Sequence, residues 1–598
     1  MPEARRTLSP AGARRGREWF ALCLLLSVPL IAQSLRPVPR VGADAIEYYS
    51  QVRSLALDHD LRLDNEYTHF NILNRGDKVH PTATGYRRTV FSVGTALLWL
   101  PFFYLGHATA WLTGQPLDGY SPAHIRSVML GSLSFGLLGL FLLHRVLRRS
   151  FDAAISLLTV ALVLCATSLF YYVVYEPIMS HAASFFLGAV ILLVAGDGRD
   201  ELPVVRAACL GLLIGLASVL RSQNGILLLL PAVLLLPMLR RRPSAALTRG
   251  CLLLVCFAVA TVPQMLAWKA LFGTHVLAYP PQGADYVQLG HPRLLETLFS
   301  SRHGLLYWTP VLWAGFLGLL GLARKRPLAS AALLLPLVAM TYVNSCIADW
   351  WGGGSFSNRR FDSILPMLAV GLAFAITWVR ALIARRPMVA VTGIALAFIA
   401  WNALLMQQYT RNWVPPDGIV TFEQLAGNSA RLVREEVGTP LAWPANWIFA
   451  LRTGLSPGHW DRMVGPYLFY RQNNLGGVIE IGTADPDADR GPLAEGWSLP
   501  RPCGEAAYCR AIAGRARLLV ALDVPQTLDV AVRAVGSGTL SMAINGTDVA
   551  QWPLTAQLAD WRVRVPADRF RRELNEVTLT IAPTDTCLID RLVFQRVK

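Results

Sequence analysis

Apolar runs about as long as membrane-spanning helices recur along the chain between residues 19 and 407. A helix needs about 20 consecutive apolar residues to cross the hydrocarbon core of a bilayer. By this criterion the sequence has predicted spans at residues 19–36, 124–147, 153–173, 182–196, 206–222, 225–240, 249–272, 304–323, 327–346, 362–384 and 388–407. The pattern predicts a multi-span α-helical membrane domain over residues 19–409, with about eleven spans.

One more apolar run, 90–113, contains Pro101, Gly106 and His107. If this run and the run 124–147 both crossed the membrane, the basic sequence HRVLRR that follows would lie on the outer side. Short loops rich in Lys and Arg lie on the cytoplasmic side of most membrane proteins. We therefore expect 90–113 to be an interfacial or re-entrant segment that does not cross.

The pattern changes near residue 500, where short alternating or β-rich runs replace the long apolar runs. Examples are LLVALDVPQTLDVAVRAV, GTLSMAING and NEVTLTIAP, which are separated by Gly, Asn, Asp and Pro. Such spacing is typical of a sandwich of antiparallel strands. We predict a small β-sandwich domain over residues 500–598, a mixed linker over 410–499 and an N-terminal tail over 1–18.

Composition agrees with the pattern. The chain of 598 residues is 53% hydrophobic and 16% charged, whereas soluble domains carry about 25% charged residues. The net charge of +16 lies largely in short basic groups that follow apolar runs, such as Arg148–Arg149, Arg240–Arg242, Arg324–Arg326 and Arg385–Arg386. A nucleic-acid-binding protein would gather this charge in one domain, so we interpret the groups as topology signals and expect no nucleic-acid partner.

With these basic groups on the cytoplasmic side, the polar and glycine-rich segments collect on the other side. They are the loop 37–89, YEPIMSH (175–181), RSQN (221–224), the loop 273–303, ADWWGGGSFSNRRF (348–361) and the chain after residue 410. We expect an integral protein of the bacterial inner membrane with a periplasmic C-terminal domain. The first apolar run ends in LRPVPR, not in a small-residue cleavage site, which favours a retained span over a removed signal peptide.

The nine cysteines do not form a zinc-binding pattern. Most lie in or beside apolar runs, where a free thiol packs as a small apolar group. Cys503 and Cys509, in PCGEAAYC, have a spacing that suits a small disulfide loop in an oxidising compartment.

The segment after the first span, VGADAIEYYSQVRSLALDHDLRLDNEY (41–67), is unusually acidic for this chain. Asp44 and Glu47 would share one face of a helix. Asp44 lies where the chain leaves the bilayer, and a carboxylate there is costly unless it faces a polar cavity. We take Asp44 and Glu47 as candidate catalytic residues. The candidate substrate-binding residues of this segment are Arg53, Asp58 and Asp60, although a solvated helix and a polar loop would show the same residues.

The segment 348–361 supplies further candidates for substrate binding: Asp349, Trp350, Trp351, Arg359 and Arg360. Arg forms bidentate contacts with phosphate, and Trp stacks on a sugar or covers a polyprenyl chain. Interfacial Trp and snorkelling Arg are the alternative interpretation. Other candidates on the same predicted face are Glu176, His181, Arg221, Arg302 and His303.

Several classes of enzyme are disfavoured. The sequence contains no phosphate-binding P-loop, HExxH or GxSxG motif, which lowers the case for ATP hydrolysis, zinc proteolysis and serine hydrolysis. It also shows no regular array of charges within the spans and no matched pair of broken helices, which are features typical of transporters.

GADAIEYY, with its acid just outside the first span, resembles the GT-C superfamily of integral-membrane glycosyltransferases. That superfamily includes protein O-mannosyltransferases, the aminoarabinose transferases of lipid A and RgtA-like enzymes. The resemblance extends over residues 19–407 in topology and also implies a membrane-hugging segment like 90–113. In the family an Asp-Glu pair is adjacent, whereas in this chain Asp44 and Glu47 are three residues apart.

The resemblance implies transfer of a sugar, with inversion, from a polyprenyl-phosphate donor to a glycan, lipid or protein acceptor on the outer face. Asp44 would accept the proton of the acceptor hydroxyl, and outward Arg residues would neutralise the departing phosphate. We favour no cofactor, although Asp44, Asp58 and Asp60 could hold a divalent cation. The alternatives are a polysaccharide polymerase or ligase, a flippase for lipid-linked glycans and a non-catalytic envelope assembly protein.

Overall fold

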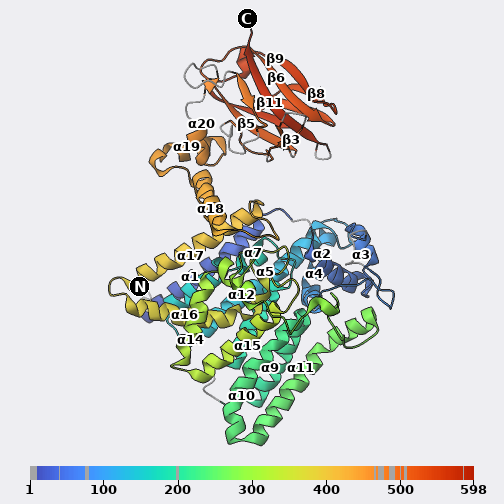
Figure 1. Ribbon diagram of the computed structural model, residues 1–598, viewed down its shortest axis with the longest axis vertical. Coiled ribbons are helices and arrows are strands. Elements are labelled where there is room, and N and C mark those ends of the chain that lie inside the picture. Colours follow the sequence, from blue (N-terminus) through green and yellow to red (C-terminus); the bar gives the residue numbers. More distant parts are fainter. Residues whose placement is uncertain are drawn as a thin grey trace, which may run out of the picture. The chain divides into compact units, whose positions relative to one another are not determined.

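The computed structural model describes residues 10–38, 41–73, 80–196, 201–463, 467–468, 477–483, 492–498, 500–503, 508–512, 514–582 and 585–597. The chain divides into two compact units, residues 1–426 and 427–598. The first unit is helical, and the second holds the β-sheets together with short helices (Figure 1). The multi-span helical region and the β-rich C-terminal region that the sequence predicts are both present.

The helical segments begin and end close to the predicted apolar runs. Those of the first unit are α1 (Pro10–Ser34), α2 (Asp44–Arg53), η1 (Ser54–Asp58), α3 (Asp64–His69), α4 (Gly94–Leu112), α5 (Pro122–Leu147), α6 (Ala153–Cys165), α7 (Leu169–Val174), α8 (His181–Ala195), α9 (Val204–Leu220), η3 (Ser222–Leu228), α10 (Leu229–Arg241), α11 (Pro243–Phe272), η4 (Ala284–Tyr286), α12 (Leu294–Phe299), α13 (Leu305–Trp308), α14 (Val311–Ala323), α15 (Pro327–Ser345), η5 (Arg359–Ile364), α16 (Leu365–Leu382) and α17 (Pro387–Thr410). Helix α18 (Phe422–Val437) begins in the first unit and ends in the second.

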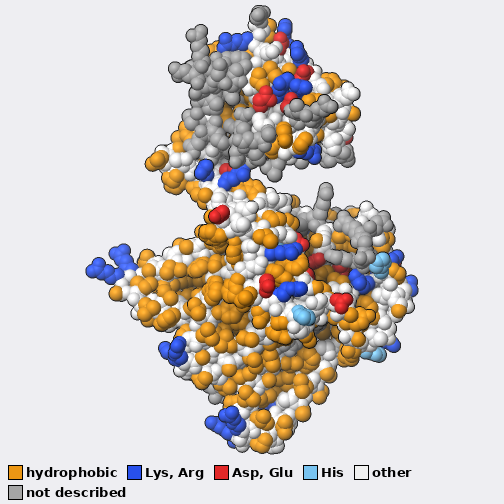
Figure 2. Space-filling model, in the orientation of Figure 1, with side chains coloured by type: hydrophobic (Ala, Val, Ile, Leu, Met, Phe, Trp, Pro, Cys, Tyr) orange, Lys and Arg blue, Asp and Glu red, His pale blue; other side chains and the backbone are white. Residues whose placement is uncertain are grey.

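Among the described residues, six helical segments are long and apolar enough to cross a membrane. They are Pro122–Leu147, Ser222–Arg241, Pro243–Phe272, Pro327–Ser345, Arg359–Leu382 and Pro387–Thr410. Helices α6, α8, α9 and α14 are apolar but shorter. Apolar side chains also cover much of the visible surface of the helical unit (Figure 2). The protein is therefore an integral membrane protein, and the count of eleven spans stays a prediction.

Two predicted spans, 153–173 and 304–323, are each divided into two helices, and the first of them consists of α6 and α7. The break between α6 and α7 frees backbone carbonyls that a continuous helix would satisfy. Asn402 of α17 donates from Nδ2 to the carbonyls of Cys165 and Thr167, at 2.9 and 3.0 Å. A partner more than 200 residues away thus stabilises the break, which explains why the local sequence did not reveal it.

The run 90–113 forms helix α4, which is not among the six candidate spans of the described chain. It packs closely on its neighbours: a Cβ on Gly94 would lie 2.5 Å from the carbonyl oxygen of Val219, and one on Gly106 would lie 2.8 Å from the Cα of His124. Whether α4 lies at the interface or crosses stays a prediction.

The first unit is held together by a large apolar core in which glycines allow close helix contacts. A Cβ on Gly318 of α14 would lie 1.8 Å from the carbonyl oxygen of Gly371 in α16. Small residues let helix backbones approach closely in membrane proteins. These contacts fix the relative positions of the helices whose ends carry the polar residues described below.

The second unit contains η6 (Pro440–Ala442), α19 (Ala445–Thr453), α20 (Gly458–Met463), η7 (Ala567–Arg569) and eleven strands among its described residues: β1 (Tyr467–Leu468), β2 (Val478–Glu480), β3 (Arg501–Pro502), β4 (Tyr508–Ile512), β5 (Arg515–Leu522), β6 (Leu528–Gly536), β7 (Thr539–Ile544), β8 (Thr547–Pro553), β9 (Ala559–Val565), β10 (Glu573–Thr580) and β11 (Cys587–Arg596). One sheet has the order β1-β5-β10-β7-β8. The other has the order β3-β4-β11-β6-β9, with β2 also paired to β11. Apolar residues of both sheets, including Leu518 and Ile589, share one core, as in a sandwich.

The predicted boundary at residue 500 is too late. Strand β1 at Tyr467–Leu468 pairs in parallel with β5, and β2 at Val478–Glu480 pairs with β11. Part of the predicted linker 410–499 therefore belongs to the sheets, and the compact unit begins at residue 427. A strand of two or three residues is too short to show alternation, so only its pairing with distant strands identifies it.

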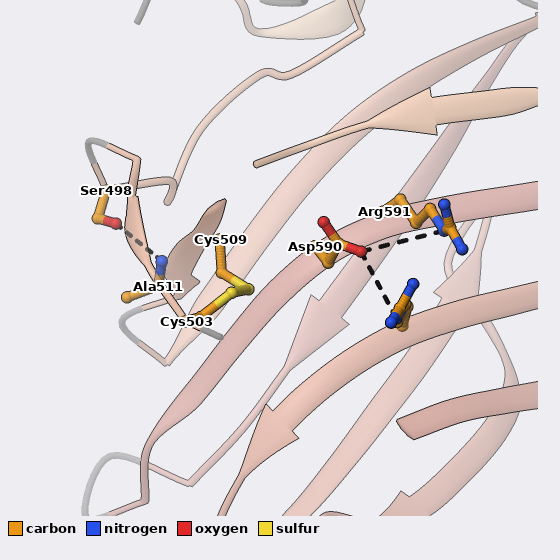
Figure 3. Close-up of a disulfide and its surroundings, with 7 residues drawn as sticks. Ser498, Cys503, Cys509, Ala511, Asp590 and Arg591 are labelled. Atoms are coloured by element: carbon orange, nitrogen blue, oxygen red, sulfur yellow. Dashed lines mark hydrogen bonds and ion pairs between the residues drawn. A yellow bond between two sulfur atoms is a disulfide. The ribbon is translucent and has the colours of Figure 1, made fainter. Parts of the chain in front are cut away.

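Cys503 and Cys509 form a disulfide, as their spacing predicts (Figure 3). It links the end of β3 to β4, next to the pairing of Arg501 with Cys509. Beyond it, Asp590 lies between Arg533 and Arg591.

Candidate functional site

The first unit contains a cavity of about 1270 Å³ that is bordered by the predicted outer loops. Its charged and hydrogen-bonding lining residues include Asp44, Tyr48, Arg88, Thr89, Glu176, His181, Arg221, Gln223, Tyr286, Asp349, Arg359 and Arg360. These residues come from segments that are far apart in the sequence, and they collect at one end of the helical unit. Seven of the residues that we selected from the sequence line this one cavity: Asp44, Glu176, His181, Arg221, Asp349, Arg359 and Arg360.

Asp44 and Arg359 meet directly in this cavity. Helix α2 begins at Asp44, so the carboxylate lies in the first turn, where the helix dipole favours negative charge. The Asp44 Oδ2 accepts from Arg359 Nη2 at 2.5 Å, and the two side chains are 27% and 13% exposed. Arg359 also donates from Nε to the carbonyl of Gly352 at 3.2 Å. The pair is therefore accessible from the cavity and is not enclosed by protein.

Arg360 lines the same cavity through a different set of contacts. Its Nη2 donates to Asp349 Oδ1 at 2.7 Å and to the hydroxyl of Tyr286 at 3.1 Å. Gln223 donates from Nε2 to the Arg360 carbonyl at 2.6 Å, which fixes the backbone. Within the described part of the chain, the buried Arg360 Nη1 has no hydrogen-bond partner. A buried guanidinium nitrogen with no acceptor is suited to an incoming anion.

His181 and Arg221 form a third group on the cavity wall. His181 Nδ1 lies 2.7 Å from Asp362 Oδ2, and both side chains are buried. Arg221 Nη1 lies 3.0 Å from the same His181 nitrogen and 3.4 Å from the carbonyl of Arg359. These contacts tie the end of α9 to η5 and hold the Arg221 guanidinium beside Arg359.

Glu176 is a partly buried carboxyl that lines the cavity. Its Oε1 accepts from the hydroxyl of Tyr171 at 2.9 Å. Burial raises the pKa of the Glu176 carboxyl above its usual value. Desolvation therefore favours its neutral form, which can donate a hydrogen bond to a bound hydroxyl group.

The lining carries more guanidinium groups than carboxyl groups. Four arginines, at positions 88, 221, 359 and 360, and three acids, at positions 44, 176 and 349, line the cavity. The excess of positive charge suits a ligand with an anionic group. Among the described residues there is no group of three or more His, Cys, Asp and Glu side chains that could hold a metal ion.

Glu47 does not line the cavity, although it follows Asp44 by one helical turn. Its Oε2 accepts from Thr89 Oγ1 at 3.0 Å and from the backbone N–H of Val90 at 2.9 Å. Thr89 and Val90 do line the cavity. Glu47 therefore holds Thr89 and Val90, two residues of the cavity wall, in place without lining the cavity itself.

Arg53, Asp58 and Asp60 lie outside the cavity, and their role in substrate binding stays a prediction. Arg53 forms ion pairs with Asp58 and, at 2.6 Å, with the buried Glu66. Asp60 Oδ1 accepts from Ser54 Oγ at 2.8 Å. These partners bind the end of α2 to α3 and stabilise the outer segment, because each carboxylate is near a donor from the same segment.

Arg302, His303, Trp350 and Trp351 also lie outside the cavity. The Arg302 guanidinium lies 3.7 Å from the centre of the Trp351 ring and pairs with Asp417 at 2.9 Å. His303 is buried, and burial lowers its pKa to about 4. The two Trp rings meet edge to face at 5.6 Å. The four side chains thus brace the loop that carries Asp349 and Arg359.

Several residues of the cavity wall were not predicted from the sequence. Tyr48 lines it, and its hydroxyl lies 3.0 Å from Ser180 Oγ. Tyr286 and Gln223 contact Arg360, and Asp362 holds His181. Asp362 follows the predicted arginines by two residues and could have been selected with them. The others are single polar residues without a local pattern.

No family model matches the sequence, and no curated protein matches it. Among solved structures, ArnT from Cupriavidus metallidurans bound to undecaprenyl phosphate is 16% identical, with 73% of this chain and 80% of that chain covered and a TM-score of 0.38. Arabinosyltransferase EmbB from Mycobacterium smegmatis is 12% identical, with 99% and 66% covered and a TM-score of 0.36. The Archaeoglobus fulgidus oligosaccharyltransferase in its apo form is 13% identical, with 75% and 58% covered and a TM-score of 0.34.

The second and third of these proteins are an arabinosyltransferase and an oligosaccharyltransferase by name, and the first is bound to undecaprenyl phosphate. Because every TM-score is below 0.5, no residue role is transferred from them. The function proposed below depends on the residues of the cavity.

Proposed function

We propose that this protein is a membrane glycosyltransferase that moves a sugar from a polyprenyl-phosphate donor to an acceptor on the periplasmic face. The observation that carries the proposal is the meeting of Asp44 and Arg359 in one cavity that also contains Arg221 and Arg360. A base for the acceptor hydroxyl and cations for the leaving phosphate are the groups that this reaction needs.

The reaction needs one bond to form and one to break at the anomeric carbon. The acceptor oxygen attacks that carbon while its proton passes to Asp44. The bond from the anomeric carbon to the phosphate oxygen breaks with its electron pair, so the phosphate gains negative charge. Arg359, Arg360 and Arg221 neutralise that charge. Attack opposite the leaving group inverts the anomeric configuration.

The ion pair between Asp44 and Arg359 gives the site a resting state. While Arg359 donates to Asp44, the guanidinium occupies the carboxylate oxygen that would accept the hydroxyl proton. The donor phosphate offers Arg359 another anionic partner inside the cavity. Donor binding would then release Asp44 to accept the hydroxyl proton only when the sugar is present.

The arginines supply the positive charge that a metal would otherwise provide, so we propose a reaction without a resident metal ion. The acceptor would be an envelope glycan, lipid or protein. The disulfide between Cys503 and Cys509 supports placing the second unit in the periplasm, because disulfides persist in oxidising compartments.

Replacement of the proposed base tests the function. In a reconstituted assay with a radiolabelled polyprenyl-phosphate sugar, Asp44→Asn should lower transfer by about 10²- to 10⁴-fold, the usual contribution of a general base. Asp64→Asn is the matched control, because Asp64 pairs with Arg87 away from the cavity. The control should retain wild-type activity.

The same assay separates the alternatives. Transport of an intact lipid-linked glycan without a new glycosidic bond would identify a flippase. Equal activity of Asp44→Asn and wild type would exclude Asp44 as the base. The folding of each variant is checked by size-exclusion chromatography in detergent, where the variant should elute as a single peak.

A further inference from the structure

A second cavity, of about 280 Å³, lies at the other ends of the helices that carry the candidate site. His181 at the start of α8 lines the candidate site, and Ala195 at its end lines this second cavity. Helix α8 has 15 residues and is therefore about 22 Å long. The two cavities are thus distinct and lie near opposite boundaries of the membrane unit.

The second cavity is amphipathic. Its apolar wall comes from six helices, α5, α8, α10, α14, α15 and α16, through residues such as Leu147, Leu234, Leu333 and Phe374. Its charged lining residues are Arg149, Lys325 and Arg326, and no carboxylate lines it among the described residues. An apolar pocket whose described charged residues are all cations matches a ligand that has an anionic head and a hydrocarbon chain.

The three cations of the second cavity differ from nearby arginines in the groups that they contact. Arg148 pairs with Glu18 at 2.6 Å, and Arg380 pairs with Asp152. Arg149, by contrast, donates to the carbonyl of Leu193, and Lys325 lies 5.6 Å from the centre of the Phe374 ring. In the part of the chain that the structure describes, neither these two side chains nor Arg326 forms an ion pair with a carboxylate.

We propose that this cavity binds an anionic phospholipid, with its phosphate between Arg149, Lys325 and Arg326 and one acyl chain along the apolar wall. Basic pockets between membrane helices attract anionic head groups, at about 1 kcal/mol for each Lys or Arg near the surface. A free anion would leave the apolar wall unfilled, and a zwitterionic head would bring its own cation to the cationic rim.

A neighbouring basic cavity supports this choice of ligand. It has a volume of about 1080 Å³, shares Arg149 with the second cavity and is also lined by Arg15, Arg145 and the Arg148–Glu18 pair. The Arg145 and Arg148 side chains are exposed at the same helix end. Because Arg148 is paired with Glu18, the charges of Arg15 and Arg145 extend the positive potential around the rim, which raises the local concentration of anionic lipid.

The test is thermal unfolding of the delipidated full-length protein in a neutral detergent, titrated with dioleoyl phosphatidylglycerol, dioleoyl phosphatidylcholine or inorganic phosphate. Phosphatidylglycerol should raise the unfolding temperature in a saturable way, and the other two should not. Arg326→Gln and Lys325→Gln should each raise the half-saturating phosphatidylglycerol concentration about fivefold, the factor that corresponds to about 1 kcal/mol.

Arg324→Gln is the matched control. It removes one positive charge from the same loop, at a residue that does not line the cavity. It should leave the half-saturating concentration unchanged. Equal losses in Arg324→Gln and Arg326→Gln would overturn the proposal in favour of general attraction between a basic surface and an anionic micelle. Protection by inorganic phosphate alone would overturn the lipid assignment.

A second variant tests the acyl chain. Ala329→Phe narrows the apolar part of the cavity while all three cations remain. It should weaken binding of dioleoyl phosphatidylglycerol, and unchanged binding would overturn the placement of the chain. None of these positions belongs to the candidate site. Lipid binding and transferase activity are therefore separate measurements in these variants, and failure of this proposal can be told apart from failure of the proposed function.

Discussion

Asp44 differs from the other carboxylates of its segment in what surrounds it. Glu47 holds the backbone at Val90, and Glu66 is buried against Arg53. Asp44 has its charge partner, Arg359, inside an open cavity. The acidic segment that the sequence shows as one cluster therefore separates into one cavity-facing acid and several structural acids.

Arg359 should contribute to both donor binding and the chemical step. Arg359→Ala should lower kcat/KM for the polyprenyl-phosphate sugar by about 10²- to 10³-fold, as the loss of a transition-state donor does. Arg359→Lys should restore part of kcat/KM, because a cation remains but the fork of donors is lost. Arg302→Ala, which removes a guanidinium outside the cavity, is the control and should retain more activity than Arg359→Ala.

The buried Glu66 predicts a pH dependence of stability. Burial raises its pKa from 4.5 to about 7, so the folded state binds more protons than the unfolded state between these values. Its stabilising contribution is fully present below pH 4.5 and is lost as the pH rises through 7. Over this pH range the free energy of unfolding should fall by about 3 kcal/mol.

Thermal unfolding in detergent at pH 5 and pH 8 measures this effect. Wild type should lose more stability than Glu66→Gln over this interval, because the amide does not titrate. Identical pH profiles would show that Glu66 is ionised throughout, as its partner Arg53 would favour.

At the scale of elements, the contacts between helices decide where the site residues meet. Gly318 and Gly371 bring α14 and α16 together, and α16 continues from η5, which carries Arg359 and Arg360. Asn402 stabilises the break between α6 and α7. Arg359 and Arg360 lie in η5, which directly precedes α16 in the chain. The packing of α16 against its neighbours therefore sets the positions of these two arginines.

Gly318→Ala should destabilise the protein by about 1–3 kcal/mol, the usual cost of overpacking, because its Cβ would meet backbone atoms of α16. Gly393→Ala in α17 is the control, since no atom lies within 4 Å of its added Cβ. That control should leave stability unchanged or raise it slightly through helix propensity. Equal unfolding temperatures of the two variants would contradict the close contact.

At the scale of the whole molecule, the helical unit and the β-rich unit each have a core of their own. The helical unit contains the complete cavity. The second unit contains the disulfide and a sandwich with no part in that cavity among its described residues. We therefore expect the chemistry to depend on the first unit.

The proposed topology predicts the sidedness of reporter fusions. Alkaline phosphatase fused after Arg411 should be active, because we place this point in the periplasm, where the disulfides of the phosphatase form. A fusion after Arg242, in a basic group that we place in the cytoplasm, should be inactive. The reverse result would put Asp44 and the arginines on the cytoplasmic side and contradict the use of a periplasmic acceptor.

The sequence by itself determined the helices of the membrane unit, the β-rich C-terminal region and the pairing of Cys503 with Cys509. Each of these depends on properties that are local in the chain: runs of apolar residues, alternation and short spacings. It also indicated Asp44 and Arg359 as members of one site, because the charge bias of the loops sorts them to one side.

Only the tertiary structure decided which of the selected residues share a cavity. Asp44 and Arg359 are separated by 315 residues, and their contact depends on how several helices pack. The same packing directs Glu47 to Val90, places Arg53 against Glu66 and brings Tyr286 to Arg360. Partner choice among polar side chains is a matter of distance in the folded chain, and no local pattern encodes it.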